Sequence, residues 1–469
     1  MSESRFNNVS PLDFRYYGSD ETLKELLGPY VTERGRVASE AMVEAAAVKT
    51  LAEWGVCSEE VAAEVAAAAE GICAEEVAAE EERIHHNIRA LVNVLRNKVS
   101  DEAKPYVHLC LTSFDVIDTA VAWRLKQAAY KVVLPQLCEL QNVLIELARR
   151  EAEQVQMGRT HGQHAVPITF GFALVGFISR LDGRMTAIKA AADNLRGKVS
   201  GAVGAYNAGR LFFSQPEKFE ADVLAHLSLE ASPTSTQIVE PEFMADYYHA
   251  LISTFGVLAD LADDMRHLQR TEIAEVGEKF EAGQVGSSTM PHKRNPWNFE
   301  NVKSMWKTFM PRMVTIYADQ LSEHQRDLSN SASSRFSPEV IVGLMDSVRR
   351  LKRVMSKLVT DEGRMEENFN MTAGMVAAEP AYILLAAQGH PDAHETMRRL
   401  TLEAQANGRP LWELLSEDDE IATYLEELSD EQKAMLKDPH GYSGIAAEKT
   451  RSVCAECERR LEALMGSLG

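Results

Sequence analysis

Three long amphipathic segments constrain the fold of this chain more than any other feature of its sequence. Residues 115–153, residues 169–195 and the stretch that begins at Pro241 repeat apolar side chains at intervals of three and four. In the last of these, the apolar series is Tyr247, Leu251, Phe255, Leu258, Ala262 and Met265. Helices of roughly 25 to 40 residues exceed the usual globular length and must bury their stripes against one another. The sequence therefore predicts an all-α protein with a central bundle of long helices, and stripes this wide favour a homo-oligomer.

The rest of the chain divides around this bundle. The N-terminal hundred residues are rich in alanine and glutamate, which are strong helix formers, and after about residue 366 the pattern changes to shorter helices separated by turns. Pro135 lies inside the first long segment, where a proline kinks or splits a helix. We expect three domains: an N-terminal helical domain (1–112), the central long-helix bundle (113–366) and a small C-terminal helical domain (367–469).

The charge balance excludes one class of partner. The chain carries a formal net charge of −21, from 49 Lys+Arg and 70 Asp+Glu, whereas a protein that binds nucleic acid needs a basic footprint. No stretch reaches the roughly 18 uninterrupted apolar residues of a membrane span, and the first residues lack the apolar core of a signal peptide. We therefore expect a cytoplasmic protein with no membrane and no nucleic-acid partner.

No pattern in the sequence indicates a metal or a cofactor. Cys454 and Cys457 form a lone C-x-x-C on a predicted C-terminal helix, with no second Cys or His pair nearby. Two thiols on one helix face explain this spacing better than a zinc or redox site does. The motifs H-E-x-x-H, G-x-S-x-G and G-x-G-x-x-G do not occur. We expect neither a metal nor a cofactor.

A polar, cationic loop follows a long helical pattern at residues 286–296, which read Gly-Ser-Ser-Thr-Met-Pro-His-Lys-Arg-Asn-Pro. Glycine relaxes the backbone, serine competes for its hydrogen bonds, and the prolines prevent a continuous helix. Such a loop between long helices is either a solvated connector or a place for chemistry. Composition alone leaves both interpretations open.

Four further polar islands interrupt the apolar pattern at helix ends: residues 85–87, 108–115, 158–164 and 323–331, with Arg335 just beyond the last. Thr112 or Ser113 fits the N-cap of the following helix. His161, within Thr-His-Gly at a helix junction, has the side chain best suited to proton transfer near neutral pH. The chemistry indicated is proton transfer on an anionic substrate that arginine and lysine hold.

Together these segments resemble the fumarase/aspartase superfamily, whose signature loop residues 286–296 match at every fixed position. Within it, the chain is most similar to the adenylosuccinate lyase family, over residues 10 to about 450. The matching segments are 10–16, 158–163, 235–237 and 324–331, and Arg335 also falls on an arginine of that family. The resemblance implies a three-domain helical fold and a homotetramer in which three subunits contribute to each active site.

The resemblance also implies a β-elimination on a nucleotide. N6-(1,2-dicarboxyethyl)-AMP would split into AMP and fumarate, and succinyl-aminoimidazole carboxamide ribotide would lose fumarate likewise. By resemblance, Ser287 is the base and His161 is the acid that protonates the departing nitrogen, with Glu300 as the partner of that histidine. A carboxylate beside an imidazole favours its charged form. Lys293 and loop amides would stabilise the serine anion once closure excludes water.

Further residues are implied to bind the substrate. The nucleotide would contact Arg15, Tyr16, His85, His86, Asn87, Arg326, Ser331 and Arg335, of which the arginines suit a phosphate. The succinyl part would contact Thr112, Ser113, Gln237, Lys293 and Asn295, with His108 close by.

Departures from the adenylosuccinate lyase pattern keep other substrates open. Asn87 stands where these enzymes usually have Asp, and Ala332 replaces a common serine. His85 and Asn87, as a His-x-Asn pair, are also similar to argininosuccinate lyase. The alternatives are therefore another superfamily lyase, such as argininosuccinate lyase or carboxymuconate cycloisomerase, and a non-enzymatic relative. The presence of both Ser287 and His161 disfavours the last.

Overall fold

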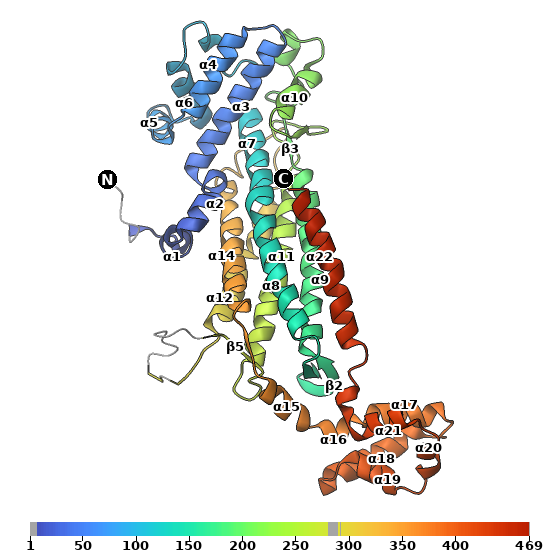
Figure 1. The fold of residues 1–469 in the computed structure, drawn as a ribbon. Helices are drawn as coiled ribbons and strands as arrows, with labels where there is room; N and C mark the ends of the chain where they lie inside the picture. The colour runs from blue at the N-terminus through green and yellow to red at the C-terminus, as the bar shows by residue number, and fades with distance from the viewer. Residues whose placement is uncertain (1–6, 280–288, 291, 469) are drawn as a thin grey trace.

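The computed structural model describes residues 7–279, 289–290 and 292–468. Within these residues the protein is helical almost throughout, which confirms the predicted all-α class. Long helices stand side by side as a bundle, with the N-terminal helices at one end and a group of short helices at the other (Figure 1). No described helix is long and apolar enough to cross a membrane.

The bundle contains the long segments that the apolar periodicity predicts. Its helices are α7 (Ser113–Ala128), α8 (Leu134–Arg150), α9 (Phe170–Asp193), α11 (Glu242–Leu268), α12 (Trp297–Phe309) and α14 (Pro338–Met355). The pairs α8–α9, α9–α11, α11–α12 and α12–α14 pack against one another. All six residues of the apolar series in α11, from Tyr247 to Met265, are buried. This burial is the main reason why helices of this length are stable.

The break expected at Pro135 takes the form of a single π-helical turn. That turn, Ala129–Val133, joins α7 to α8, and Pro135 lies in the first turn of α8. A proline is tolerated there because the first N–H groups of a helix need no intrahelical partner. The two helices therefore continue in line along the bundle (Figure 1).

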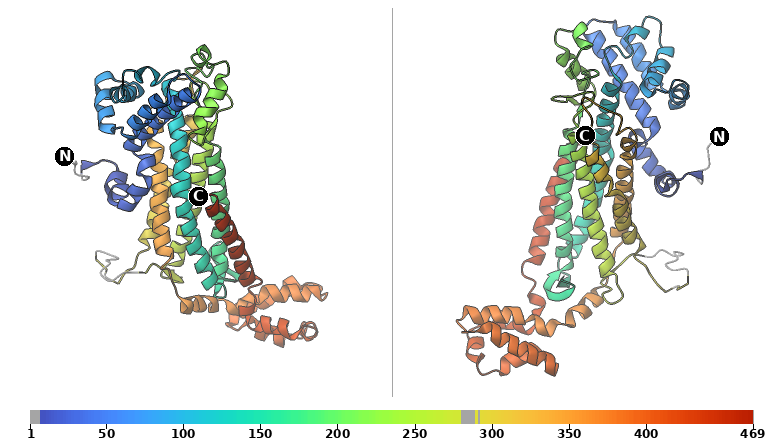
Figure 2. Two further views of the ribbon diagram at one scale, coloured as in Figure 1. Left: turned by 45° about the horizontal axis from the view of Figure 1, so that its top comes forward. Right: turned by 180° about the vertical axis from the view of Figure 1, so that it is seen from behind.

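The N-terminal helices form one end of the molecule, as the views in Figure 2 also show. They are α1 (Pro11–Arg15), α2 (Glu21–Val31), α3 (Glu33–Glu53), α4 (Glu59–Glu70), α5 (Ala74–Ile84) and α6 (Asn87–Asn97), with 3-10 turns at Tyr17–Ser19 and Lys104–Tyr106. A 3-10 turn at Gly209–Leu211 and α10 (Pro216–Ala225) lie beside them. α3 is the central helix of this end because it packs on α2, α4, α7 and α10.

The few strands are short and occur in pairs. β1 (Val155–Thr160) and β2 (Gln163–Thr169) form an antiparallel hairpin between α8 and α9, at the end of the bundle opposite the N-terminal helices. The other pairs are β3 (Arg196–Gly197) with β4 (Glu230–Ala231), which is parallel, and β5 (Val276–Gly277) with β6 (Val359–Thr360), which is antiparallel. The sequence interpretation did not predict the β1–β2 hairpin.

The remaining helices follow the bundle in sequence. They are α13 (Arg312–Ala318), a 3-10 turn at Ser333–Phe336, α15 (Glu362–Asn370), α16 (Ala373–Val376), α17 (Ala378–Ala387), α18 (Ala393–Asn407), α19 (Leu411–Glu417), α20 (Ala422–Glu426), α21 (Asp430–Lys437), a 3-10 turn at Pro439–Gly441 and α22 (Ala446–Gly466). A separate apolar core joins α17 to α21. α22 instead returns to the bundle and packs on α8 and α9, where Cys454 and Cys457 are buried as free thiols. The three predicted domain boundaries remain a prediction.

Candidate active site

The island at residues 108–115 caps a bundle helix. Thr112 is the N-cap of α7, and its backbone N–H donates to Oδ2 of Asp115 at 2.8 Å. This confirms the cap expected from Thr112, Ser113 and the acidic residue that follows them. Both Thr112 and Ser113 are half-buried.

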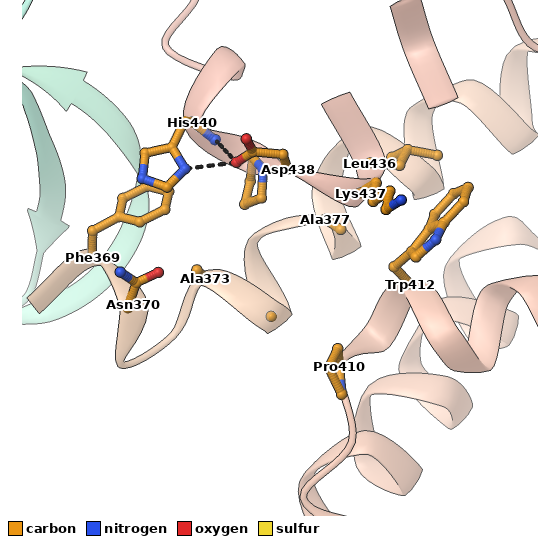
Figure 3. A pocket seen from close by; sticks show the side chains of 12 residues that line it. Phe369, Asn370, Ala373, Ala377, Pro410, Trp412, Leu436, Lys437, Asp438 and His440 are labelled. Carbon is orange, nitrogen blue, oxygen red and sulfur yellow. Dashed lines mark hydrogen bonds and ion pairs between the residues drawn. The ribbon is translucent and has the colours of Figure 1, made fainter. Parts of the chain in front are cut away.

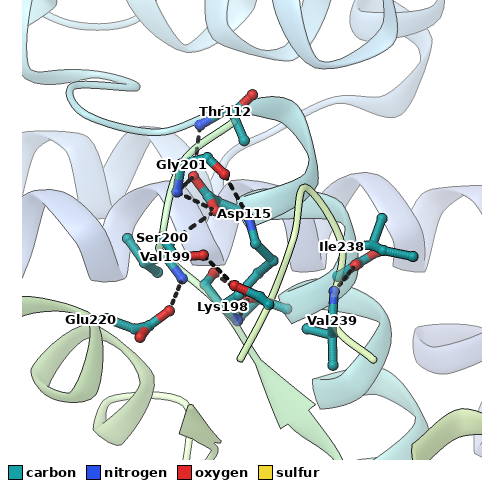
Figure 4. A network of polar contacts seen from close by, with 12 residues as sticks. Thr112, Asp115, Lys198, Val199, Ser200, Gly201, Glu220, Ile238 and Val239 are labelled. Carbon is teal, nitrogen blue, oxygen red and sulfur yellow. Dashed lines mark hydrogen bonds and ion pairs between the residues drawn. The ribbon is translucent and has the colours of Figure 1, made fainter. Parts of the chain in front are cut away.

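Asp115 connects this cap to two distant segments (Figure 4). Its carboxylate, which has no exposed surface, pairs with the equally buried ammonium group of Lys198 and accepts the N–H groups of Ser200 and Gly201 at 3.2 Å. Oγ of Ser200 lies 2.5 Å from Oγ of Ser235. The structure thereby brings the segment that contains Gln237 to the start of α7, as the predicted substrate site requires.

Arg326 also lies at the start of α7. Its guanidinium group is 5.3 Å from the ring centroid of Phe114, and its Nε is buried without a hydrogen-bond partner among the described residues. Asp118, one turn further along α7, accepts the N–H of Val239 at 2.9 Å. Burial raises the pKa of Asp118 to about 6, although Lys198 and Arg326 act in the opposite direction. A cation, a ring and a titratable carboxylate thus lie at the first turns of α7.

His108 is held by a buried carboxylate. Its Nδ1 lies 2.6 Å from Oε1 of Glu44, a side chain of α3 with no exposed surface. Burial alone lowers the pKa of His108, but the charges of Glu44 and Asp115 outweigh it, so the net pKa is raised. A protonated imidazole in this place offers Nε2–H to an anion.

The island at residues 85–87 forms the junction between α5 and α6. His85 ends α5 with φ at 58°, and Nδ1 of the N-cap residue His86 accepts the N–H of Arg89 at 3.2 Å. Both histidines are exposed, and Asn87 begins α6. The imidazole of His86 therefore has a structural bond on one nitrogen, which leaves Nε2 for a ligand.

His161 lies at the tip of the β1–β2 hairpin and not at a simple helix junction. His161 and Gly162 have φ of 56° and 73°, and they connect the paired residues Thr160 and Gln163. Two central residues with positive φ are the signature of a tight type I′ turn. The imidazole is exposed and has no hydrogen-bond partner among the described residues.

The residues of the signature loop fall partly outside the described residues. Ser287 lies outside the described residues, so its predicted role as the base remains a proposal from the sequence. Lys293 is exposed, and its N–H donates to the carbonyl of Met290 at 3.0 Å. Asn295 is half-buried, and Glu300 is exposed in the first turn of α12.

The N-terminal arm reaches the same helix. Nδ2 of Asn301 on α12 lies 3.5 Å from the hydroxyl of Tyr16, which places Tyr16 against the first turns of α12. Arg15, the last residue of α1, is exposed. Ser331 and Arg335 are exposed as well, Arg335 within the 3-10 turn at Ser333–Phe336.

Backbone strain gathers in the polar islands. Among the described residues, eight non-glycine residues have a positive φ, and five of them belong to the four islands. These five are His85, His108, Cys110, His161 and His324. Strained backbone of this kind tends to persist at functional sites. The islands were singled out by composition, so the strain is independent support for them.

One chain does not gather all the predicted residues. Thr112 and Ser113 begin α7, whereas His161 follows α8 at the far end of the bundle (Figures 1 and 2). The continuous run from Ser113 to Arg150 is about 57 Å long at about 1.5 Å per residue. A single small substrate cannot contact both ends of such a run.

A pocket near the hairpin does not belong to this set. It lies where α15 and α16 meet the turn at Pro439–Gly441, and none of the predicted site residues lines it (Figure 3). The His440 ring packs on Phe369 at 4.1 Å between centroids, and Nδ1 of His440 lies 2.6 Å from Asp438. The contacts of His440 therefore join the turn at Pro439–Gly441 to α15.

Sequence reasoning missed three carboxylates that organise the site: Glu44, Asp118 and Glu275. Glu44 is a single acidic residue between buried apolar positions of α3, and Asp118 follows Asp115 at helical spacing. Buried acidic residues in such apolar stripes were the available signal, because a charge of this kind is buried only with a partner.

Comparisons with known proteins cover nearly the whole chain. Residues 4–310 match a family described as Lyase, and residues 322–439 match a family described as Adenylosuccinate lyase C-terminal. An adenylosuccinate lyase from Pyrococcus abyssi is 34% identical over 96% of this chain and 99% of that protein. One from Archaeoglobus fulgidus is 32% identical over 95% of this chain and 98% of its own length.

Two solved structures have the same fold over most of their length. The 3-carboxy-cis,cis-muconate lactonizing enzyme from Pseudomonas putida superposes with a TM-score of 0.82 and 26% identity, over 96% of this chain and all of that chain. A fumarate lyase from a Mesorhizobium species gives a TM-score of 0.81 at 22% identity, over 93% and 98% of the two chains. The second likeness concerns the fold alone.

Proposed function

This chain belongs to the adenylosuccinate lyase family, and on that premise we propose that it cleaves N6-(1,2-dicarboxyethyl)-AMP into AMP and fumarate. The same C–N lyase activity would release fumarate from succinyl-aminoimidazole carboxamide ribotide. The observation that carries this assignment is the end-to-end similarity, 34% identity over 96% of this chain, which includes the C-terminal segment.

The proposed elimination moves two protons. Ser287 removes the proton beside a carboxylate, and the electron pair of that C–H bond forms the double bond of fumarate. The C–N bond breaks, and His161 protonates the departing nitrogen. The exposed imidazole at a tight turn supports this role, because an acid must reach the leaving group. Glu300 is proposed to orient His161, and Lys293 to stabilise the negative charge that develops on the carboxylate.

The substrate contacts are proposed from two groups of residues. At the start of α7, Thr112, Ser113 and Gln237 are proposed to bind the succinyl carboxylates, with His108 close by and Arg326 over the ring of Phe114. Near α12, Asn295 lies in the same segment as Lys293. The nucleotide is assigned to the residues proposed from the resemblance: Arg15, Tyr16, His85, His86, Asn87, Arg326, Ser331 and Arg335.

We propose a homotetramer in which different subunits complete each site. Within one chain, Ser113 at the start of α7 and His161 beyond α8 lie at opposite ends of a helical run about 57 Å long. Antiparallel packing of bundles from several copies would bring the end with His161 beside the start of α7 in another copy. The cytoplasmic location expected from the sequence stays a prediction.

A substrate panel tests the function. Purified protein is expected to convert adenylosuccinate into AMP and fumarate, seen as a change in ultraviolet absorbance. The likeness to the muconate lactonizing enzyme adds 3-carboxymuconate to the panel, and the His85-x-Asn87 pair adds argininosuccinate. Turnover of either without any turnover of adenylosuccinate would contradict the proposal.

The catalytic roles have their own test. Ser287→Ala and His161→Ala are each expected to lower kcat by about 10²- to 10⁴-fold, because a positioned acid or base contributes that much. Matched controls are Ser356→Ala and His226→Ala, since Ser356 bonds only a carbonyl of its own helix and His226 pairs with Glu53 at the surface. Near-full activity of Ser287→Ala would remove Ser287 as the base.

A further inference from the structure

The end of β5 and the start of α12 are joined by a buried polar contact. Glu278, 6% exposed, directly follows β5, and Asn298, 7% exposed, is the second residue of α12. Oε2 of Glu278 accepts a hydrogen bond from Nδ2 of Asn298 at 2.5 Å. Oε1 of Glu278 accepts the backbone N–H groups of Asn298 at 3.0 Å and Phe299 at 3.3 Å.

These bonds make Glu278 the N-terminal cap of a helix to which it does not belong. The residue before α12 is Pro296, whose side chain has no polar atom to bond the free N–H groups of the first turn. A carboxylate at this place satisfies two of those donors and also opposes the positive end of the helix dipole. Glu300 lies in the same turn of α12, two residues after Asn298.

Two further side chains hold the contact from outside. Gln269, at the end of α11, accepts the N–H of Glu278 at 3.1 Å and donates to the carbonyl of Arg294 at 3.3 Å. Arg350 of α14 donates to Oδ1 of Asn298 at 3.1 Å, and its guanidinium group lies 5.9 Å from the ring centroid of Trp297. The network therefore holds the carbonyl of Arg294, between Lys293 and Asn295, and the first turn of α12 that follows them.

We propose that Glu278 is a positioning residue for the elimination: by capping α12 from outside, it fixes Glu300 and the residues that precede the helix. Glu278 is buried and does not touch the substrate. This inference rests on the proposed function, in which Glu300 orients the acid and Lys293 holds the developing charge. A misplacement of about 1 Å in such groups can cost about 100-fold in rate.

The test uses an exchange of donor and acceptor. Glu278→Gln keeps the size of the side chain but turns an NH₂ group towards Nδ2 of Asn298, so two donors meet. Asn298→Asp sets two carboxylates against each other. The double variant, Glu278→Gln with Asn298→Asp, restores one donor facing one acceptor, and Arg350 then pairs with the new carboxylate at position 298.

Each single variant is expected to lower kcat by about 10- to 100-fold with KM changed less than about threefold, because the substrate contacts at α7 remain. The double variant is expected to recover kcat to within about threefold of the wild type. The alkaline limb of kcat against pH should shift to lower pH in Glu278→Gln, since a misplaced Glu300 no longer favours the protonated acid.

A control separates positioning from stability. Asp182 is a buried carboxylate that pairs with Arg460 of α22 at 3.0 Å, away from α12. Asp182→Asn is expected to lower the Tm without moving the pH limb or kcat per folded site. The proposal would be overturned if Glu278→Gln had the same pH profile and kcat as the wild type. It would also be overturned if the kcat of the double variant were no higher than that of either single variant.

A readout that needs no turnover keeps this proposal apart from the proposed function. Hydrogen–deuterium exchange of the first turn of α12 should quicken in Glu278→Gln and in Asn298→Ala, and return in the double exchange variant. If the wild type does not turn over adenylosuccinate, the proposed function fails while faster exchange still identifies the cap. Unchanged exchange in both single variants would overturn the cap itself.

Discussion

Arg159 and Glu275 form a buried ion pair in which Nη2 of the arginine lies 2.6 Å from Oε1 of the glutamate. Glu275 has no exposed side-chain surface, and it also accepts hydrogen bonds from Gln156 at 2.7 Å and Asn368 at 2.8 Å. Arg159 lies on β1, two residues before His161. The exposed His161 is thus carried on a hairpin that Glu275 holds through Gln156 and Arg159.

Removal of the charge of Glu275 should weaken the fold. Glu275→Gln is expected to lower the free energy of unfolding by about 2 kcal/mol, because it leaves the half-buried Arg159 without its carboxylate. Denaturation at matched protein concentration measures this loss. The control is Asp260→Asn, since the Arg180–Asp260 pair has side chains that are 50% and 57% exposed and such pairs contribute about 1 kcal/mol or less. Equal losses in the two variants would contradict the central place of Glu275.

Loss of Glu44 should change how substrate binding depends on pH. Burial lowers the pKa of His108 and Glu44 raises it, so Glu44→Gln is expected to lower this pKa. His108 then loses its positive charge at a lower pH, and KM should begin to rise at a lower pH than in the wild type. An NMR titration of the His108 ring and KM at several pH values measure both effects.

The matched control for this variant is Glu53→Gln, whose partner His226 lies 3.0 Å away at the surface. It should leave KM unchanged at every pH. The free energy of unfolding depends on the same protonation. The stabilisation from His108 is complete below the pKa that His108 has in the unfolded state, and it is lost as pH rises through the raised pKa of the folded state. An unaltered titration of His108 in Glu44→Gln would show that Glu44 does not raise the pKa of His108.

Asp118 should make the protein less stable as pH rises. Burial raises its pKa from 3.8 to about 6, so the folded state holds the proton more tightly than the unfolded state does. The stabilisation is complete below pH 3.8 and is lost as pH rises through about 6. Asp118→Asn should therefore gain stability relative to the wild type across this range, by at most about 3 kcal/mol. Tm differences that stay flat between pH 4 and pH 7 would show that this carboxyl is not perturbed.

Mixed tetramers should recover activity from inactive variants. Ser113→Ala and His161→Ala change opposite ends of the bundle, so a site that draws these ends from different subunits can be intact in a mixed oligomer. After joint unfolding and refolding at equal amounts, about one quarter of the sites should hold both native residues. Steady-state activity measures the recovery, and each variant refolded alone is the control. No recovery in verified mixed oligomers would place each site within one chain.

The arrangement of helices was largely predictable from local pattern. The apolar series of α11 from Tyr247 to Met265 is buried as its spacing indicates, and Thr112 caps α7 as its neighbours indicate. Both features depend on residues within a few positions of one another. Helix periodicity and capping act over one or two turns, so the linear sequence contains the whole signal.

Contacts between distant segments were not predictable in this way. Glu44 bonds His108 across 64 positions, and Arg159 pairs with Glu275 across 116. No residue near Glu44 or Glu275 in the sequence indicates which residue will pair with it, because the partner depends on which helix faces meet after folding. The β1–β2 hairpin under His161 was also missed, although its pairing is local; what the sequence could not indicate is the packing of β1 on the distant helix α15.

The sequence by itself determined the class of the fold and, through resemblance, the residue types of the chemistry. Only the tertiary structure decided that His161 stands at a hairpin tip, that Glu278 caps α12 from β5, and that Ser113 lies at the other end of the bundle from His161. The reason is physical. Helix formation is decided by neighbours along the chain, whereas the position of a polar side chain in a site is decided by non-local packing that no short stretch of sequence encodes.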